Sequence, residues 1–113
     1  MIRIAVIVLG VLLSFAANAQ TVRLESYLHP KNEMFRTFNQ LYLAGVVDGL
    51  VIYSVGTADK LFCMPGKLAL TTEQAANILL SWAKKQTQNT NDLPIGIALL
   101  GGLKETFPCP TGN

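Results

Sequence analysis

Two cysteines, one histidine and a few carboxylates are the residues of this chain that could do chemistry. Cys63 and Cys109 each lie in a short motif anchored by proline, Phe62-Cys63-Met64-Pro65 and Phe107-Pro108-Cys109-Pro110. A reactive cysteine needs a neighbouring base or a second cysteine close by. Neither cysteine lies in a C-x-x-C motif, and His29, the sole histidine, is far away in sequence. We therefore predict that the two cysteines form one structural disulfide.

The remaining polar residues do not form the pattern of an active site. Catalysis requires a nucleophile with its base, a pair of carboxylates or a set of metal ligands. No Cys/His or carboxylate cluster has metal-ligand spacing, and the glycines follow neither nucleotide-binding pattern. His29 stands beside Pro30 and is expected on the surface. We predict no enzymatic activity, no cofactor and no metal.

Asp48 is the most unusual single residue. At helical spacing its neighbours carry no charge, and Gly45 and Gly49 flank it. A carboxylate on such a face must find a hydrogen-bond donor or bear a large burial cost. Two interpretations fit this pattern: a buried Asp48 bonded to a loop backbone, or a contact of Asp48 to a dimer mate or a target.

Residues 1–19 have the three parts of a secretory signal peptide. Arg3 supplies a short basic region, residues 4–15 an apolar region, and Ala17-Asn18-Ala19 a cleavage site of the A-x-A type. The apolar run is shorter than the about 20 residues that a membrane span needs. We expect cleavage after Ala19 and export to the periplasm, where oxidising conditions let thiols form disulfides.

Composition predicts that residues 20–113 form a single domain with one small core. The chain has a net charge of +2, and removal of Arg3 with the signal peptide lowers it by one. This near balance argues against nucleic acid and against an acidic membrane surface as partners. Because 50% of the residues are hydrophobic, we expect some apolar surface to remain for a protein partner.

The longest apolar pattern predicts a helix from Glu33 to about Val55, with Asn32 as its N-cap. Its apolar residues are dense: Met34, Phe35, Phe38, Leu41, Tyr42, Val46, Leu50, Ile52 and Tyr53. Such a helix is either buried on most sides, or buried on one side with an oligomer interface on another. Residues 20–31, which precede it, show no clear period.

Two shorter helices are expected after it. Thr71-Thr72-Glu73-Gln74 fits a capping box, and one apolar face then follows at helical spacing: Ala75, Ile78, Leu79 and Trp82. A last helix is expected over 94–107, with a kink at Gly101-Gly102 and these residues inward: Leu99, Leu100, Leu103 and Phe107. The predicted fold class is therefore all-α, a small bundle of three to four short helices cross-linked by one disulfide.

The segment from Gln86 to Asp92 is polar and lacks a helical period, so we predict a loop there. The side-chain amides of Gln88, Asn89 and Asn91 suit hydrogen bonding in the polar cleft of a partner. An ordinary solvent-exposed loop explains the same composition equally well.

Four motifs, taken in order along the chain, resemble one family. They are Leu41-Tyr42-Leu43-Ala44-Gly45-Val46-Val47-Asp48-Gly49, then Phe62-Cys63-Met64-Pro65, then Leu70-Thr71-Thr72-Glu73-Gln74, then Phe107-Pro108-Cys109-Pro110. This ordered set is similar to the Rap/Tai immunity proteins of type VI secretion amidase effectors, and it covers residues 41–110.

The resemblance implies a periplasmic all-α protein, a homodimer, that binds a cell-wall amidase and blocks it sterically. These amidases are papain-like cysteine peptidases that cut the peptide stems of peptidoglycan. Within the family pattern, Cys63 and Cys109 correspond to the disulfide and Asp48 to the motif carboxylate. The pattern assigns no inhibitory loop. This sequence also differs from the family pattern at Gly101-Gly102, where members commonly carry alanine and longer side chains.

Two other functions stay open. One is a periplasmic acid-stress chaperone of the Hde type, a class of small exported helical proteins that dissociate in acid and expose apolar surface. Carboxylates are few here, however, and His29 is the sole histidine, the residue type best suited to a switch in mild acid. The other is an envelope protein of the same fold with an unknown partner.

Overall fold

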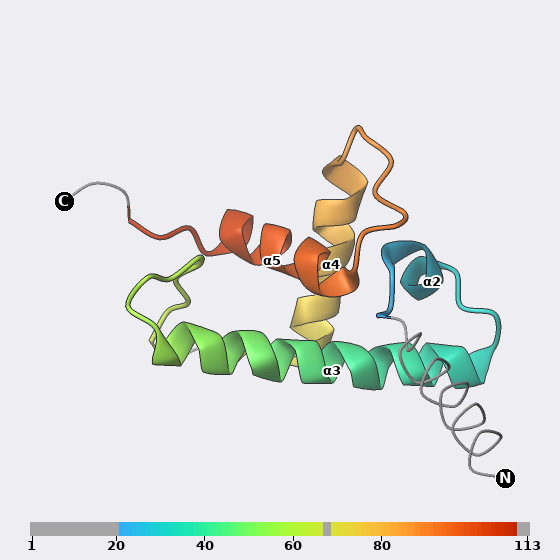
Figure 1. Cartoon of the computed structure of the whole chain (residues 1–113), viewed down its shortest axis with the longest axis horizontal. Coiled ribbons are helices and arrows are strands. Elements are labelled where there is room, and N and C mark those ends of the chain that lie inside the picture. The colour runs from blue at the N-terminus through green and yellow to red at the C-terminus, as the bar shows by residue number, and fades with distance from the viewer. Residues whose placement is uncertain (1–20, 67–68, 111–113) are drawn as a thin grey trace, which may run out of the picture.

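The computed structural model describes residues 21–66 and 69–110. Within them the chain forms four helices: α2 (Leu24–Leu28), α3 (Glu33–Gly56), α4 (Thr72–Lys85) and α5 (Ile95–Thr106). In Figure 1, α3 runs along the lower edge, α5 lies above it, and α4 crosses both steeply. The predicted all-α fold with one disulfide is confirmed. The predicted signal peptide, residues 1–19, lies outside the described residues.

The long helix α3 begins as its sequence predicts. The side-chain oxygen of Asn32 accepts a hydrogen bond from the backbone N–H of Phe35 at 3.0 Å, so it satisfies one of the free donors of the first turn. The helix ends at Gly56, one residue beyond the expected end. Its buried side carries Leu43 and Val47, and this side packs against α4 and α5.

The predicted capping box at the start of α4 is confirmed. The Thr71 hydroxyl accepts from the Gln74 N–H at 3.1 Å, and the Gln74 side chain accepts from the Thr71 N–H at 3.0 Å. These reciprocal bonds fix the first turn of α4. The predicted apolar face then packs into the core, with Ala75 and Leu79 fully buried.

Helix α5 is continuous through Gly101 and Gly102, where the sequence pattern predicted a kink. A Cβ atom on Gly101 would lie 2.7 Å from the Trp82 ring, and one on Gly102 would lie 2.7 Å from Cγ2 of Ile78. Cβ atoms essentially never lie this close to another heavy atom, so a side chain at either position would force Trp82 or Ile78 on α4 to shift. The pair therefore lets α5 lie close against α4.

All four helices, the lead-in to α2 and the α3–α4 connection contribute to one core. Its fully or almost fully buried apolar residues are Val22, Leu24, Leu43, Val47, Phe62, Ala75, Leu79, Ile95, Ala98, Leu99 and Leu103. Each of these residues removes apolar surface from water, which is the dominant favourable term in folding.

Helix α2 was not predicted, because residues 20–31 showed no period. It has only five residues, too few for a helical pattern. The chain just before it forms an isolated antiparallel bridge between Arg23 and Pro94. The start of the described chain is thus attached to the residues just before α5.

Candidate functional site

Cys63 and Cys109 are bonded to each other, as predicted. The backbone N–H of Cys63 also donates to the carbonyl of Phe107 at 2.8 Å, and Phe62 beside it is fully buried. The disulfide therefore fastens the α3–α4 connection to the end of α5. Both cysteines of the sequence are used in this bond, so the cysteines form a structural cross-link.

Asp48 is exposed on the outer side of α3. The interpretation of a buried carboxylate bonded to a loop backbone is wrong for this chain, because Asp48 is exposed and its side chain makes no hydrogen bond to a described residue. The reason lies in the helix itself. Leu43 and Val47 lie on the buried side of α3, which packs against α4 and α5. Asp48 lies on the opposite, exposed side. Its contact to a dimer mate or a target stays a proposal.

The outer side of α3 carries an apolar row, which we call the α3 stripe. Its members follow one another at helical spacing around a central gap, and each exposes between 54% and 80% of its surface: Met34, Phe38, Leu41, Ile52 and Val55. Burial of α3 on most sides is therefore wrong. The other interpretation, burial on one side with an interface on another, fits this exposure.

Two glycines and Asp48 lie in the central gap of the α3 stripe. A Cβ atom on Gly45 or on Gly49 would meet nothing within 4 Å. Glycine inside a helix costs about 1 kcal/mol relative to alanine. No close contact within the described chain requires glycine at these two positions. These positions leave room for the backbone of a partner to approach closely.

By length and composition alone, α3 also passes as a membrane-spanning helix. Its 24 residues span about 36 Å. Asp48 lies near the middle of the helix, however, where a charge in a bilayer costs about 3 kcal/mol or more. One side of α3 also packs on α4 and α5. Helix α3 is therefore a helix of the bundle, buried on one side and exposed on the other.

The predicted loop from Gln86 to Asp92 joins α4 to α5 and projects from the top of the molecule in Figure 1. Gln88, Asn89 and Asn91 are all exposed. The side-chain oxygen of Asn89 accepts from the Asn91 N–H at 3.0 Å, and the Leu93 N–H donates to the Thr90 carbonyl at 3.0 Å. The loop therefore has a defined turn, in which Asn89 also has a structural role.

Both ends of this α4–α5 loop are held. On the α4 side, the Gln86 side chain donates to the Trp82 carbonyl at 3.0 Å. On the α5 side, the carbonyls of residues 91–93 all accept hydrogen bonds from residues 23–25. Sequence reasoning missed this second attachment. Its one local trace is the alternation of buried Val22, exposed Arg23 and buried Leu24, which is typical of a short extended segment.

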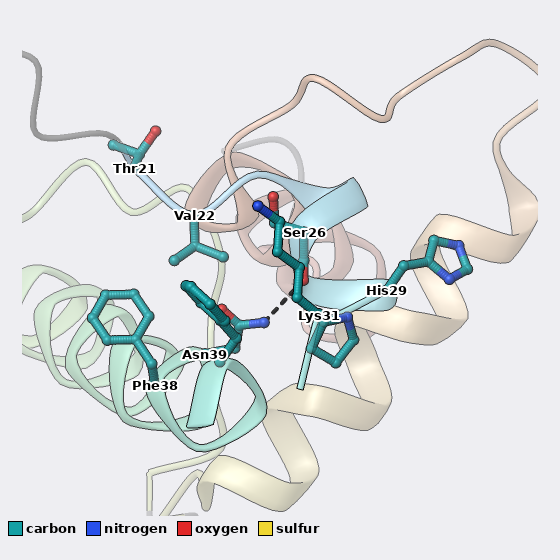
Figure 2. Close-up of a pocket in the computed structure, with 9 residues that line it drawn as sticks. Thr21, Val22, Ser26, His29, Lys31, Phe38 and Asn39 are labelled. Carbon is teal, nitrogen blue, oxygen red and sulfur yellow. Dashed lines mark hydrogen bonds between the residues drawn. The ribbon is translucent and has the colours of Figure 1, made fainter. Parts of the chain in front are cut away.

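A pocket of about 240 Å³ lies between α2 and the start of α3 (Figure 2). Across it, the buried side chain of Asn39 donates to the Ser26 carbonyl at 2.9 Å. His29 is exposed, and its ring points away from Asn39 (Figure 2). No carboxylate lines this pocket, so no lining group would orient His29 as a general base.

Only one described titratable side chain has a clearly shifted pKa. Burial raises the pKa of the Tyr27 hydroxyl above its ordinary value, and a hydrogen bond from Gln40 at 3.3 Å opposes part of that shift. Over residues 21–66 and 69–110, no group of three or more His, Cys, Asp or Glu side chains could hold a metal ion. Two exposed features of the described residues are candidate surfaces for a partner: the α4–α5 loop and the α3 stripe.

Comparison with known families gives one match. The family model described as Rap1a immunity proteins matches residues 16–109, which include both cysteines, all of α3 and the α4–α5 loop. Searches of curated proteins and of solved structures gave no match.

Proposed function

This chain belongs to the family of Rap1a immunity proteins, and we propose that it binds and sterically blocks a peptidoglycan amidase delivered by type VI secretion. An immunity role implies an effector as partner. The amidase and the periplasm come from the motifs of this sequence, because the ordered set over residues 41–110 resembles the immunity proteins of that effector class. An exported chain with a signal peptide at residues 1–19 would meet its effector in the periplasm.

The α4–α5 loop is the observation that carries this proposal. It projects from the bundle (Figure 1), both of its ends are hydrogen-bonded, and Asn89 fixes its turn. A protruding segment that is already ordered loses little conformational entropy on entering a cleft. Amide side chains at the exposed positions Gln88 and Asn91 suit a polar active-site cleft, where each donates and accepts hydrogen bonds.

The target is found first and the loop is tested against it. The tagged, oxidised mature protein is used to capture partners from secreted and periplasmic fractions, and mass spectrometry identifies them. Recovery of one cell-wall amidase in equal amounts supports the proposal. Recovery of many unrelated envelope proteins only at low pH would instead favour the Hde-type chaperone, and recovery of none would favour an orphan member of the fold.

Binding of the purified amidase then tests the loop. Gln88→Arg and Asn91→Arg change exposed side chains and leave the Asn89 turn in place, so affinity should fall while the melting temperature stays the same. Asn77→Arg adds the same charge at an exposed site on α4 and serves as the control. Equal affinity of both loop variants and the wild type would remove the loop from the interface.

We propose further that the chain is a homodimer joined through the α3 stripe. The five large side chains of the stripe together expose on the order of 600 Å², the size of the largest apolar patch on a typical monomer. With the residues along the edges of the stripe, this surface approaches the size of a standard protein–protein interface, which buries about 800 Å² on each partner. The open positions Gly45 and Gly49 allow two helices to approach closely at the centre.

The oligomeric state tests this second proposal. Ile52→Glu places a second carboxylate on the stripe, one turn from Asp48, and should convert a dimer to a monomer in sedimentation equilibrium. Ile97→Glu makes the same change at an exposed position on α5 and should leave the dimer intact. A wild-type chain that sediments as a monomer at micromolar concentration would rule out this use of α3.

A further inference from the structure

The α4–α5 loop is attached to a segment almost seventy residues earlier in the chain. Three consecutive carbonyls at the end of the loop each accept a hydrogen bond from that segment. Leu24 N–H donates to the Leu93 carbonyl at 2.9 Å, Glu25 N–H donates to the Asn91 carbonyl at 3.1 Å, and the Arg23 guanidinium donates to the Asp92 carbonyl between them. We call this attachment the clip.

The clip is anchored in the core on both sides of Arg23. Val22 and Leu24 are buried, and the N–H of Ile95 donates back to the Val22 carbonyl at 2.9 Å. The extended backbone turns every second side chain outward, which leaves Arg23 exposed over the loop. Its contact with the Asp92 carbonyl joins the anchored segment to the exposed end of the loop.

The Arg23 side chain binds a loop carbonyl that no backbone N–H of the segment binds. The carbonyls of Asn91 and Leu93 face the segment and bond to its N–H groups, while the Asp92 carbonyl is reached by the Arg23 side chain. A guanidinium offers several donors in a fixed plane, so it suits a carbonyl that the backbone does not reach. Apart from the clip and the bonds of Gln86 to α4, the described hydrogen bonds of the loop are those within its own turn.

We propose that Arg23 is a positioning residue for partner binding, which holds the α4–α5 loop in its binding conformation through the Asp92 carbonyl. The inference rests on the proposed function for the partner, and it extends the binding site to the first residues of the described chain. Fixing the backbone of each loop residue costs conformational entropy. A loop that is ordered before binding avoids this cost at the encounter.

Hydrogen exchange of the free, oxidised protein tests the first half of the proposal without any partner. In Arg23→Ala, the amides of Asn91 and Leu93 should exchange roughly three- to ten-fold faster, as expected for the loss of one solvent-exposed hydrogen bond of ordinary net strength. Core amides of α3 and α4 should keep their protection. Arg36→Ala is the matched control, because it removes an exposed arginine with the same charge, paired only with Glu33 in α3.

Binding kinetics with the captured amidase test the second half. Arg23→Ala should weaken affinity at an unchanged melting temperature, Arg23→Lys should recover part of the loss, and Arg36→Ala should match the wild type. Unchanged exchange at Asn91 and Leu93 would overturn the proposal, as would faster exchange with full affinity. Failure of the wild type to bind any amidase would count against the proposed function, and the exchange rates would still decide whether Arg23 holds the loop.

Discussion

Gly102→Ala should destabilise the protein although alanine is the better helix former. The new Cβ atom would lie 2.7 Å from Cγ2 of Ile78 and 3.1 Å from its backbone carbonyl oxygen. The side chain of Ile78 can rotate away, but its carbonyl moves only if α4 moves. Overpacking of this kind costs about 1–3 kcal/mol, and helix propensity returns about 1 kcal/mol. The difference is a loss of about 0–2 kcal/mol, and we expect a value near its middle, about 1 kcal/mol.

Urea denaturation at a fixed protein concentration measures this loss as a lower midpoint with an unchanged slope. Gly96→Ala is the matched control in the same helix. Its Cβ atom would meet only Cγ1 of Val46 at 3.6 Å, an ordinary contact, so this variant should be as stable as the wild type or slightly more stable. Equal midpoints for Gly102→Ala and Gly96→Ala would show that close packing of α5 on α4 does not require glycine.

Three further predictions concern the frame around the candidate surfaces. Joint replacement of Cys63 and Cys109 by serine should lower stability by up to about 4 kcal/mol, since the bond joins residues separated by 46 positions; calorimetry of both proteins checks this, and an unchanged melting temperature would contradict it. Thr71→Ala should cost about 1 kcal/mol, because it removes the cap of α4; a loss below the error of urea denaturation would speak against the capping box. Tyr27→Phe should remove a loss of stability at alkaline pH. Because the pKa of Tyr27 is raised in the folded state, its contribution is present below the unfolded pKa of about 10 and is lost as pH rises through the folded pKa. The free energy of unfolding of both proteins is measured from pH 8 to 11, and an equal fall with pH in the two would contradict this.

Features encoded by neighbouring residues could be predicted from the sequence. The capping box needs only Thr71 and Gln74, the start of α3 needs only Asn32, and the single pair of cysteines leaves one possible disulfide within the chain. The two caps depend on residue type at short spacing, which tertiary contacts did not override, and the disulfide depends only on the presence of two cysteines.

The missed features depend on contacts between distant residues or on exposure. The clip joins Arg23 to Asp92, 69 positions apart, and the five residues of α2 are too few to show a period. Asp48 was misjudged for a different reason. A row of uncharged helical neighbours looks the same in sequence whether it faces a core or an interface, so the pattern around Asp48 could not distinguish the two.

The position of the disulfide also determines what happens if the loop is cut. The α4–α5 loop, residues 86–92, lies between Cys63 and Cys109. A protease that hydrolyses one peptide bond in this loop therefore cannot separate the two fragments, because the sulfur–sulfur bond still joins them. After a cut before Asn91, the clip also joins the two fragments, because residues 23–25 of one bind the carbonyls of residues 91–93 of the other. A nicked molecule would run as one chain in a non-reducing gel and as two after reduction.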